Sequence, residues 1–317
     1  MRPGSLAIGI GLAGLLLLLL PDQAWAWTPG THVYLGESLL ANLQLLPIAT
    51  AELLRTYPYD FLYGNIAADS SMAKKHAPVG RHCHFWHVGQ EVHDRAPTDE
   101  LRAFGLGYLC HLAADTVAHN HFVPRQLVLT AGTAGVGHTY WESRVDTHLG
   151  ARYARAAKEL IGMDTSSADA HLDMLISPTI FSVRTNRRLF RGMVHLAETR
   201  SWHSGLRVAV ERSRVPLSDA EVEGHLALAY DFMVELLSTP DARPRRLDPS
   251  GERPLHLSKV VRRRVLQEGT RHRVRRLVEA ADAHFGLPPD PPAFWPARVR
   301  PLPWRAPALR RQRRLGS

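Results

Sequence analysis

The segment HLAADTVAHNHF, residues 111–122, places metal-binding side chains at helical spacing. His111, Asp115 and His119 follow one another at intervals of four, so they form one stripe on a helix. An imidazole and a carboxylate one turn apart lean the same way and can bind one divalent ion. The flanking residues are apolar, and without a metal ion this His/Asp stripe would leave polar groups buried without partners. The segment therefore predicts a metal site and disfavours a solvated polar face.

The segment GHTYWES, residues 137–143, repeats the pairing with His138 and Glu142. On its own, such a pair occurs as readily on an ordinary helix surface as in a site. Beside the first stripe, we interpret it as the second half of the same centre.

Further candidate ligands precede these two segments. RHCHFWH, residues 81–87, contributes three crowded histidines, of which His84 stands before two aromatic residues. Asp69 lies in the loop GNIAADSS, where a lone aspartate is usually a cap or turn residue, and His32 lies near the start of the chain. A mixed set of imidazole and carboxylate ligands suits zinc.

Cys83 and Cys110 are the only two cysteines, which excludes a four-cysteine zinc site. In an oxidising compartment they would be able to form one disulfide. The alternative is a pair of small buried thiols, and the sequence leaves both open.

The first 26 residues have the layout of a secretory signal peptide. Arg2 precedes an apolar run over residues 6–20, and Ala24-Trp25-Ala26 provides a cleavage site. The run is short for a membrane span, which needs about 20 residues. We therefore expect an exported protein, secreted or periplasmic, whose mature chain begins at Trp27.

Helical periodicity dominates the mature chain and strand-like alternation is scarce, so we expect an all-α, compact multi-helix fold. The helical stretches cover residues 34–55 with a break near Pro47, 99–119, 138–162, 186–213 and 217–238. Ser218 and Glu221 suit a capping box at the start of the last stretch. A Pro-rich polar segment after Pro240 predicts a boundary. The expected domains are a signal peptide (1–26), a helical domain (27–240) and a C-terminal extension (241–317).

Basic charge is concentrated in this extension. Residues 241–317 carry 19 Lys/Arg and 7 Asp/Glu, whereas residues 1–240 carry 20 and 23. One amphipathic helix is predicted over residues 257–286, and the Pro-rich end after it is expected to be extended. This helix either lies on an anionic membrane surface or packs its apolar stripe on the body. Contact with nucleic acid is a less favoured third possibility.

Taken in chain order, these residues resemble the zinc-dependent phospholipase C family and, more distantly, the single-strand-specific nucleases that share its fold. Both are all-helical and hold three zinc ions with a tryptophan N-terminus. The resemblance implies two to three zinc ions in this chain, with Asp115 bridging two of them. The metal ligands that it implies are Trp27 through its amino nitrogen and carbonyl oxygen, His32, Asp69, His84, His111, Asp115, His138 and Glu142, with one more histidine.

That last histidine has two candidates. Some members place it six residues after the bridging aspartate, which selects His121. The domain of the glycosylphosphatidylinositol-specific phospholipase D type places it four residues after, which selects His119. Helix geometry favours His119, and both remain candidates.

The resemblance implies hydrolysis of a phosphodiester by a metal-activated water, with Asp69 as a ligand, a general base, or both. The leading function is phospholipase C action on a phospholipid. A nuclease and a non-catalytic zinc-stabilised binding protein are the alternatives. Glu142 favours the phospholipase, because the nucleases typically have aspartate there. Ser70 stands where phosphatidylcholine-cleaving members have an aromatic residue, so the head group stays open.

We expect the purified mature protein to begin at Trp27, because the signal peptide should be cleaved after Ala26. Cleavage there would give Trp27 the free amino terminus that it needs to act as a ligand. Intact-mass measurement or N-terminal sequencing checks this. A mature protein that retains residues 1–26 would remove Trp27 from the ligand set.

Overall fold

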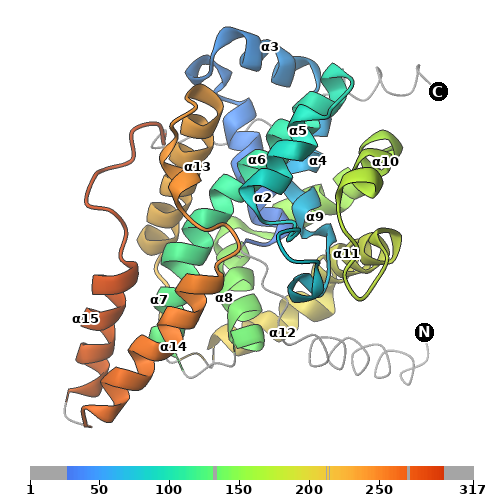
Figure 1. Cartoon of the computed structure of the whole chain (residues 1–317). Helices are drawn as coiled ribbons and strands as arrows, with labels where there is room; N and C mark the ends of the chain where they lie inside the picture. Colours follow the sequence, from blue (N-terminus) through green and yellow to red (C-terminus); the bar gives the residue numbers. More distant parts are fainter. Residues whose placement is uncertain (1–26, 131–133, 212, 214, 270–271, 296–317) are drawn as a thin grey trace, which may run out of the picture.

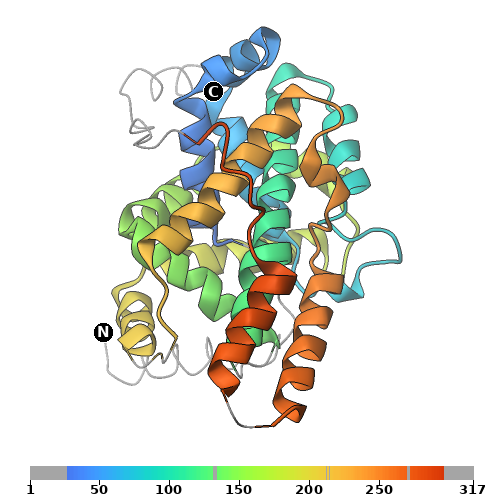
Figure 2. The same ribbon diagram turned by 90° about the vertical axis from the view of Figure 1, so that its left-hand side faces the viewer.

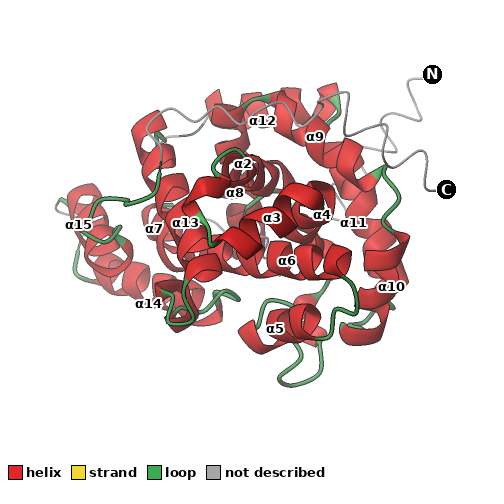
Figure 3. Ribbon diagram, turned by 90° about the horizontal axis from the view of Figure 1, so that it is seen from above, coloured by secondary structure: helices red, strands yellow, loops and turns green. Residues whose placement is uncertain are grey.

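The computed structural model describes residues 27–130, 134–211, 213, 215–269 and 272–295. Every regular element in these ranges is a helix, which confirms the all-α prediction (Figure 3). Within them, no helix is both long and apolar enough to cross a membrane. The predicted signal peptide, residues 1–26, and the chain end, residues 296–317, lie outside the described residues.

Helix α6 (Asp99–Val117) runs through the interior of the molecule (Figure 1). Its residues are buried on all sides from Ala103 onward with a single partial exception, as expected for a helix that is apolar all round. The helices packed most extensively against it are α4 (Pro58–Ala67), α13 (Asp219–Ser238) and α5 (Trp86–Asp94). From Ala103 onward, the side chains of α6 therefore face other elements of the fold, whereas Asp99 and Arg102 in its first turn are exposed.

Two glycines bring α4 and α6 into backbone contact. A Cβ atom at Gly64 would lie 2.1 Å from the carbonyl oxygen of Phe104, and one at Gly107 would lie 2.0 Å from that of Phe61. Real Cβ atoms cannot approach so closely, so only glycine permits this crossing. The crossing fixes the segment after α4, including Asp69, beside the second half of α6.

The α-helical hydrogen-bond pattern of α6 stops at Val117. A single π-helical turn, Ala118–Phe122, follows and leads into α7 (Val123–Leu129). Such turns are rare and often lie at functional sites. The predicted helix is thus found over most of its length, but the change of pitch near its end was not predicted.

The remaining helices follow the predicted stretches, with more breaks. The break near Pro47 is confirmed. The stretch over residues 138–162 divides at Gly150, whose φ of 84° favours glycine, and the stretch over 186–213 divides after residue 197. These helices are α2 (Pro29–Leu40), α3 (Ile48–Thr56), α8 (Ala134–Leu149), α9 (Ala151–Ile161), α10 (Ser166–Leu175), α11 (Val183–Ala197) and α12 (Arg200–Glu211). The Ser218 hydroxyl accepts from the Glu221 N–H, as a cap should.

The C-terminal extension holds two helices where one was predicted. α14 (Glu252–Gln267) and α15 (Arg273–Phe285) lie side by side against α7 (Figures 1 and 2). The predicted apolar stripe is buried against Val128 and comprises Val261, Val265, Leu277, Ala281 and Phe285. This arrangement corresponds to the alternative in which the stripe packs on the body. The continuous helix was wrong because each segment turns back to bury its own apolar face.

The end of the described chain is also fastened to the body. The Asp231 carboxylate on α13 accepts hydrogen bonds from the backbone N–H groups of Ala293, Phe294 and Trp295. The extension is therefore part of the packed structure up to residue 295.

We expect Phe285→Ala to lower the free energy of unfolding by about 3 kcal/mol, because it empties a buried aromatic position in the α7–α14–α15 cluster. Chemical denaturation monitored by circular dichroism measures this. Val274→Ala, at a position 76% exposed on the same helix, serves as the control and should change stability by less than about 0.5 kcal/mol. Equal effects of the two substitutions would contradict the packing described here.

Candidate metal centre

Eight of the ten predicted ligands converge in the interior, and none of the eight is more than 1% exposed. They come from five parts of the chain that meet at the second half of α6. They are His32 on α2, Asp69 after α4, His84 before α5, His111 and Asp115 on α6 with His119 in the π-helical turn, and His138 and Glu142 on α8.

Hydrogen bonds at the start of α2 join this helix to α8. Helix α2 carries His32, and α8 carries His138 and Glu142. The hydroxyls of Thr28 and Thr31 both donate to the Asp146 carboxylate on α8. Thr28 also caps α2, since its hydroxyl accepts from the Thr31 N–H. Asp146 lies one helical turn after Glu142, so the capping contact holds His32 and Glu142 on facing helices.

Asp115 lies at the centre of the first half of the site. Its Oδ1 is 3.1 Å from His32 Nε2, and its Oδ2 is 2.9 Å from His84 Nε2 and 3.0 Å from His111 Nε2. Asp69 joins the same group, with its Oδ1 3.4 Å from His84 Nε2. Three imidazoles thus surround one carboxylate, and the bridging of two ions by Asp115 stays a prediction.

His119, His138 and Glu142 form the second half. His138 Nε2 lies 2.6 Å from Glu142 Oε1, and the rings of His119 and His138 are 5.2 Å apart and nearly perpendicular. Their ligand atoms lie close enough together to hold one metal ion. The spacing predicted from sequence therefore brings the second pair to the end of the first stripe.

The buried oxygens of the site fit a cation. Within the described residues, Asp69 Oδ2, both oxygens of Asp115 and both of Glu142 are buried without hydrogen-bond geometry to any partner. Buried carboxylates in this condition are costly unless a positive charge compensates them. Together with the imidazoles they make a donor set that zinc prefers.

Backbone carbonyls orient two of the imidazoles. His111 Nδ1 lies 2.7 Å from the Asn65 carbonyl oxygen, and His119 Nδ1 lies 2.6 Å from that of Pro249. A proton donated from Nδ1 leaves the Nε2 lone pair directed into the cluster, as in metal sites with an outer hydrogen-bond shell. Pro249 had been assigned to a linker, and no pattern in its sequence marks this role.

Gly251 follows in the same segment and fits tightly against His119. Its φ is 71°, and a Cβ there would lie 2.7 Å from His119 Cβ. The segment around Pro249 and Gly251 thus closes one side of the centre.

The protonation states of two ligands reflect burial. Burial lowers the pKa of His119 to about 4, so the ring is neutral at neutral pH, as a ligand must be. Burial and the nearby Asp69 and Asp115 carboxylates raise the pKa of Glu142 well above its usual range. A cation at this position would oppose that shift.

Of the other two predicted ligands, His121 lies outside these groups and Trp27 lies beside α6. His121 Nδ1 is 3.0 Å from the Gly286 carbonyl oxygen, and among the described residues His121 joins none of the ligand groups. Trp27 is buried beside α6, where its indole N–H donates to the Ala114 carbonyl oxygen at 3.1 Å. Its role as a ligand through a free amino terminus stays a prediction.

Cys83 and Lys74 also lie against the candidate ligands. Cys83 and Cys110 are buried free thiols, and Cys83 Sγ lies 3.2 Å from His84 Nδ1. Lys74, which the sequence analysis missed, is 4% exposed, and its Nζ is 2.8 Å from Asp69 Oδ1.

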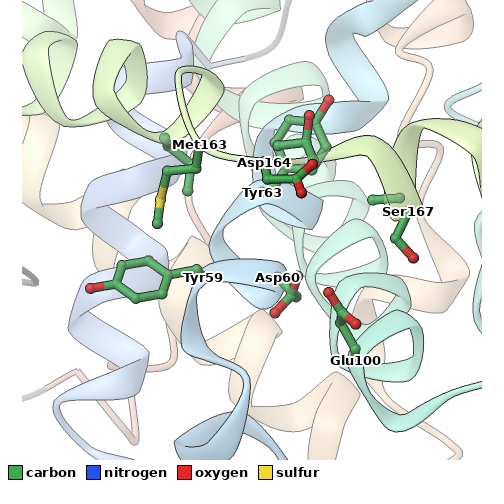
Figure 4. A pocket seen from close by; sticks show the side chains of 10 residues that line it. Tyr59, Asp60, Tyr63, Glu100, Met163, Asp164 and Ser167 are labelled. Atoms are coloured by element: carbon green, nitrogen blue, oxygen red, sulfur yellow. The ribbon is translucent and has the colours of Figure 1, made fainter. Parts of the chain in front are cut away.

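A small pocket lies elsewhere, near the start of α6 (Figure 4). Tyr59, Asp60, Glu100 and Asp164 are among its lining residues. Glu100 is separated from His111 by about 16 Å along the helix axis, so this pocket is distinct from the candidate metal centre.

We expect His119→Ala to lower bound zinc by about one ion per chain, because it removes a ligand from the second group. His121→Ala is the matched control, and its zinc content should stay near normal because this ring contacts a backbone carbonyl. Elemental analysis of the two purified variants distinguishes them. Zinc loss in His121→Ala alone would reverse the assignment.

Comparison with known proteins agrees with this geometry. A family model described as zinc dependent phospholipase C matches residues 31–176. The matched range includes every ligand candidate except Trp27. No curated protein and no solved structure was found to match the chain. Residues 31–176, a little under half of the chain, are therefore similar to the zinc-dependent phospholipase C family.

Proposed function

We propose that this protein is a zinc-dependent phosphodiesterase that cleaves a phospholipid in the manner of a phospholipase C. The observation that carries the proposal is the meeting of eight buried histidine, aspartate and glutamate side chains inside the family domain. Several carboxylate oxygens among them have no hydrogen-bond partner in the described chain, which supports a role in binding cations.

We assign the residues to the two halves of the centre described above. His32, Asp69, His84, His111 and Asp115 would bind metal in the first half, with Trp27 added once the signal peptide is removed. His119, His138 and Glu142 would bind metal in the second half. Bound zinc would supply Lewis-acid polarisation of a phosphoryl oxygen and would lower the pKa of a water molecule towards neutrality.

The protein side chains then have two tasks. Asp115 holds three imidazoles in a fixed arrangement, and the Asn65 and Pro249 carbonyls fix the orientation of His111 and His119. Asp69 carries the catalytic assignment, because its Oδ2 is buried beside the ligand group without a hydrogen bond among the described residues. A carboxylate oxygen in that state is available to a metal ion or to an attacking water.

The two alternative functions are a single-strand-type nuclease and a non-catalytic zinc-stabilised protein. Glu142 in the last ligand position favours the phospholipase over the nuclease, as the resemblance implies. Membrane contact through the C-terminal extension stays a prediction. The apolar stripe of that extension is buried against α7, so an anionic surface would meet its outer face, where arginines lie beside exposed apolar residues such as Val260 and Val274.

We expect Asp115→Asn to lower zinc content and to reduce hydrolysis of phospholipid by at least about 100-fold, because it removes the charge shared by three imidazoles. The measurements are elemental analysis, thermal unfolding, and release of phosphorylated head groups from choline, ethanolamine and inositol lipids. Single-stranded DNA is included as a competing substrate.

Asp219→Asn, at a position 97% exposed, controls for the loss of an acidic group elsewhere. Unchanged zinc content and melting temperature in Asp115→Asn would rule out the assigned centre. Cleavage of DNA without cleavage of any lipid would favour the nuclease. Full zinc binding with neither activity would favour the non-catalytic alternative.

A further inference from the structure

A buried lysine lies against the candidate metal ligands. Lys74 Nζ is 2.8 Å from Asp69 Oδ1 and 3.3 Å from His84 Nε2, and only 4% of the residue is exposed. Lysine is rarely buried unless its charge is paired. Here the carboxylate of Asp69 is the partner of the ammonium group. The side chain therefore places a positive charge inside the site.

The local backbone holds Lys74 in this inward position. Ala73 adopts the left-handed conformation, with φ 53° and ψ 43°, which is uncommon for a residue with a Cβ atom. A short 3-10 turn, Lys74–His76, begins directly after it. The preceding residue, Met72, is fully buried, and its carbonyl accepts a hydrogen bond from the Thr179 hydroxyl at 2.7 Å. Strained backbone of this kind persists where surrounding contacts over-determine it, often at functional sites.

The position of Lys74 relative to the ligands limits what can lie between them. Asp69 Oδ1 and His84 Nε2 are 3.4 Å apart and belong to one candidate metal group with His111. A zinc ion bonded to both atoms at ordinary bond lengths would lie within about 4 Å of the Lys74 ammonium. Two cations that close together repel each other in a dry interior, and the shared Asp69 carboxylate offsets only part of that repulsion. An anion that touches both would lower the repulsion further.

A phosphoryl group has the charge and the size for this position. Its neighbouring oxygens let it accept a hydrogen bond from an ammonium and bind a metal ion at the same time, and a lysine point charge is a common phosphate partner. We propose that Lys74 is a substrate-binding residue that donates to a non-bridging oxygen of the phosphodiester beside the Asp69–His84 edge of the centre. The inference rests on the proposed zinc centre and adds a phosphate-binding residue to it.

The test measures phosphate binding, so that it does not depend on turnover. Inorganic phosphate is titrated into the zinc-loaded mature protein by calorimetry, and zinc content is determined for each sample. We expect Lys74→Met to keep its zinc and to bind phosphate about 10- to 100-fold more weakly, because a charge-assisted hydrogen bond is lost. Lys74→Arg keeps the charge and should bind within about 3-fold of the wild type.

Lys158→Met is the matched control, because Lys158 also forms a carboxylate pair, at 2.7 Å to Glu198, away from the site. Its phosphate affinity should not change. If Lys74→Met does not fold, Lys74→Gln replaces it, since glutamine keeps a donor for Asp69 but not the charge, and the same loss is expected.

The remaining outcomes are distinct. The inference would be overturned if Lys74→Met, or Lys74→Gln in its place, bound phosphate as tightly as the wild type. It would also be overturned if the zinc-loaded wild-type protein did not bind phosphate. A gain of one zinc ion on removal of Lys74 would also overturn it, because the ammonium would then be a substitute for a metal. A wild-type protein without zinc would instead contradict the proposed function itself.

Discussion

Three carboxylates, those of Asp69, Asp115 and Glu142, lie almost without solvent contact inside an apolar helical body. An uncompensated buried charge is costly, so the fold must supply partners for them. Imidazoles surround Asp115, a lysine reaches Asp69, and His138 lies against Glu142. Helices α2, α6 and α8 and the segment before α5 meet this requirement, because each brings at least one of these partners or carboxylates to the interior.

The helices that meet this requirement are placed by contacts outside the site. The glycines at the α4–α6 crossing let the two backbones touch, and the crossing sets the height of Asp69 relative to His111. Asp146 does the same for α2 and α8 through two threonine hydroxyls. These contacts bind no ligand, yet a shift in either would move donor atoms that must meet within a few tenths of an ångström.

Much of the site was predictable because its chemistry depends on spacing within single helices. His111 with Asp115, and His138 with Glu142, each lie one turn apart, and such pairs are visible in a sequence. The choice between His119 and His121 was harder, since the π-helical turn at residues 118–122 changes the pitch where the two rings lie. The structure brings His119 to the cluster through that turn.

Contacts between segments that are far apart in the chain have no such spacing pattern in the sequence. Lys74 is one of two adjacent lysines in a polar loop, and the left-handed backbone of Ala73 that turns it inward has no glycine to mark it. The stretch around Pro249 was interpreted as a linker because of its composition, although its carbonyl orients His119 from 130 residues further along the chain. The division of the extension into two helices was likewise hidden, because the apolar residues of α14 and α15 fit one continuous stripe.

The closing of the centre by the Pro249–Gly251 segment has a consequence for the order in which the protein is assembled. All the other contributors to the metal cluster are synthesised by residue 142, but His119 acquires its orienting carbonyl only when residue 249 has been made and docked. A chain that is interrupted in between would hold all the candidate ligands but would lack the carbonyl that orients the His119 ring. The orientation of His119 thus depends on a segment that is made 130 residues after it.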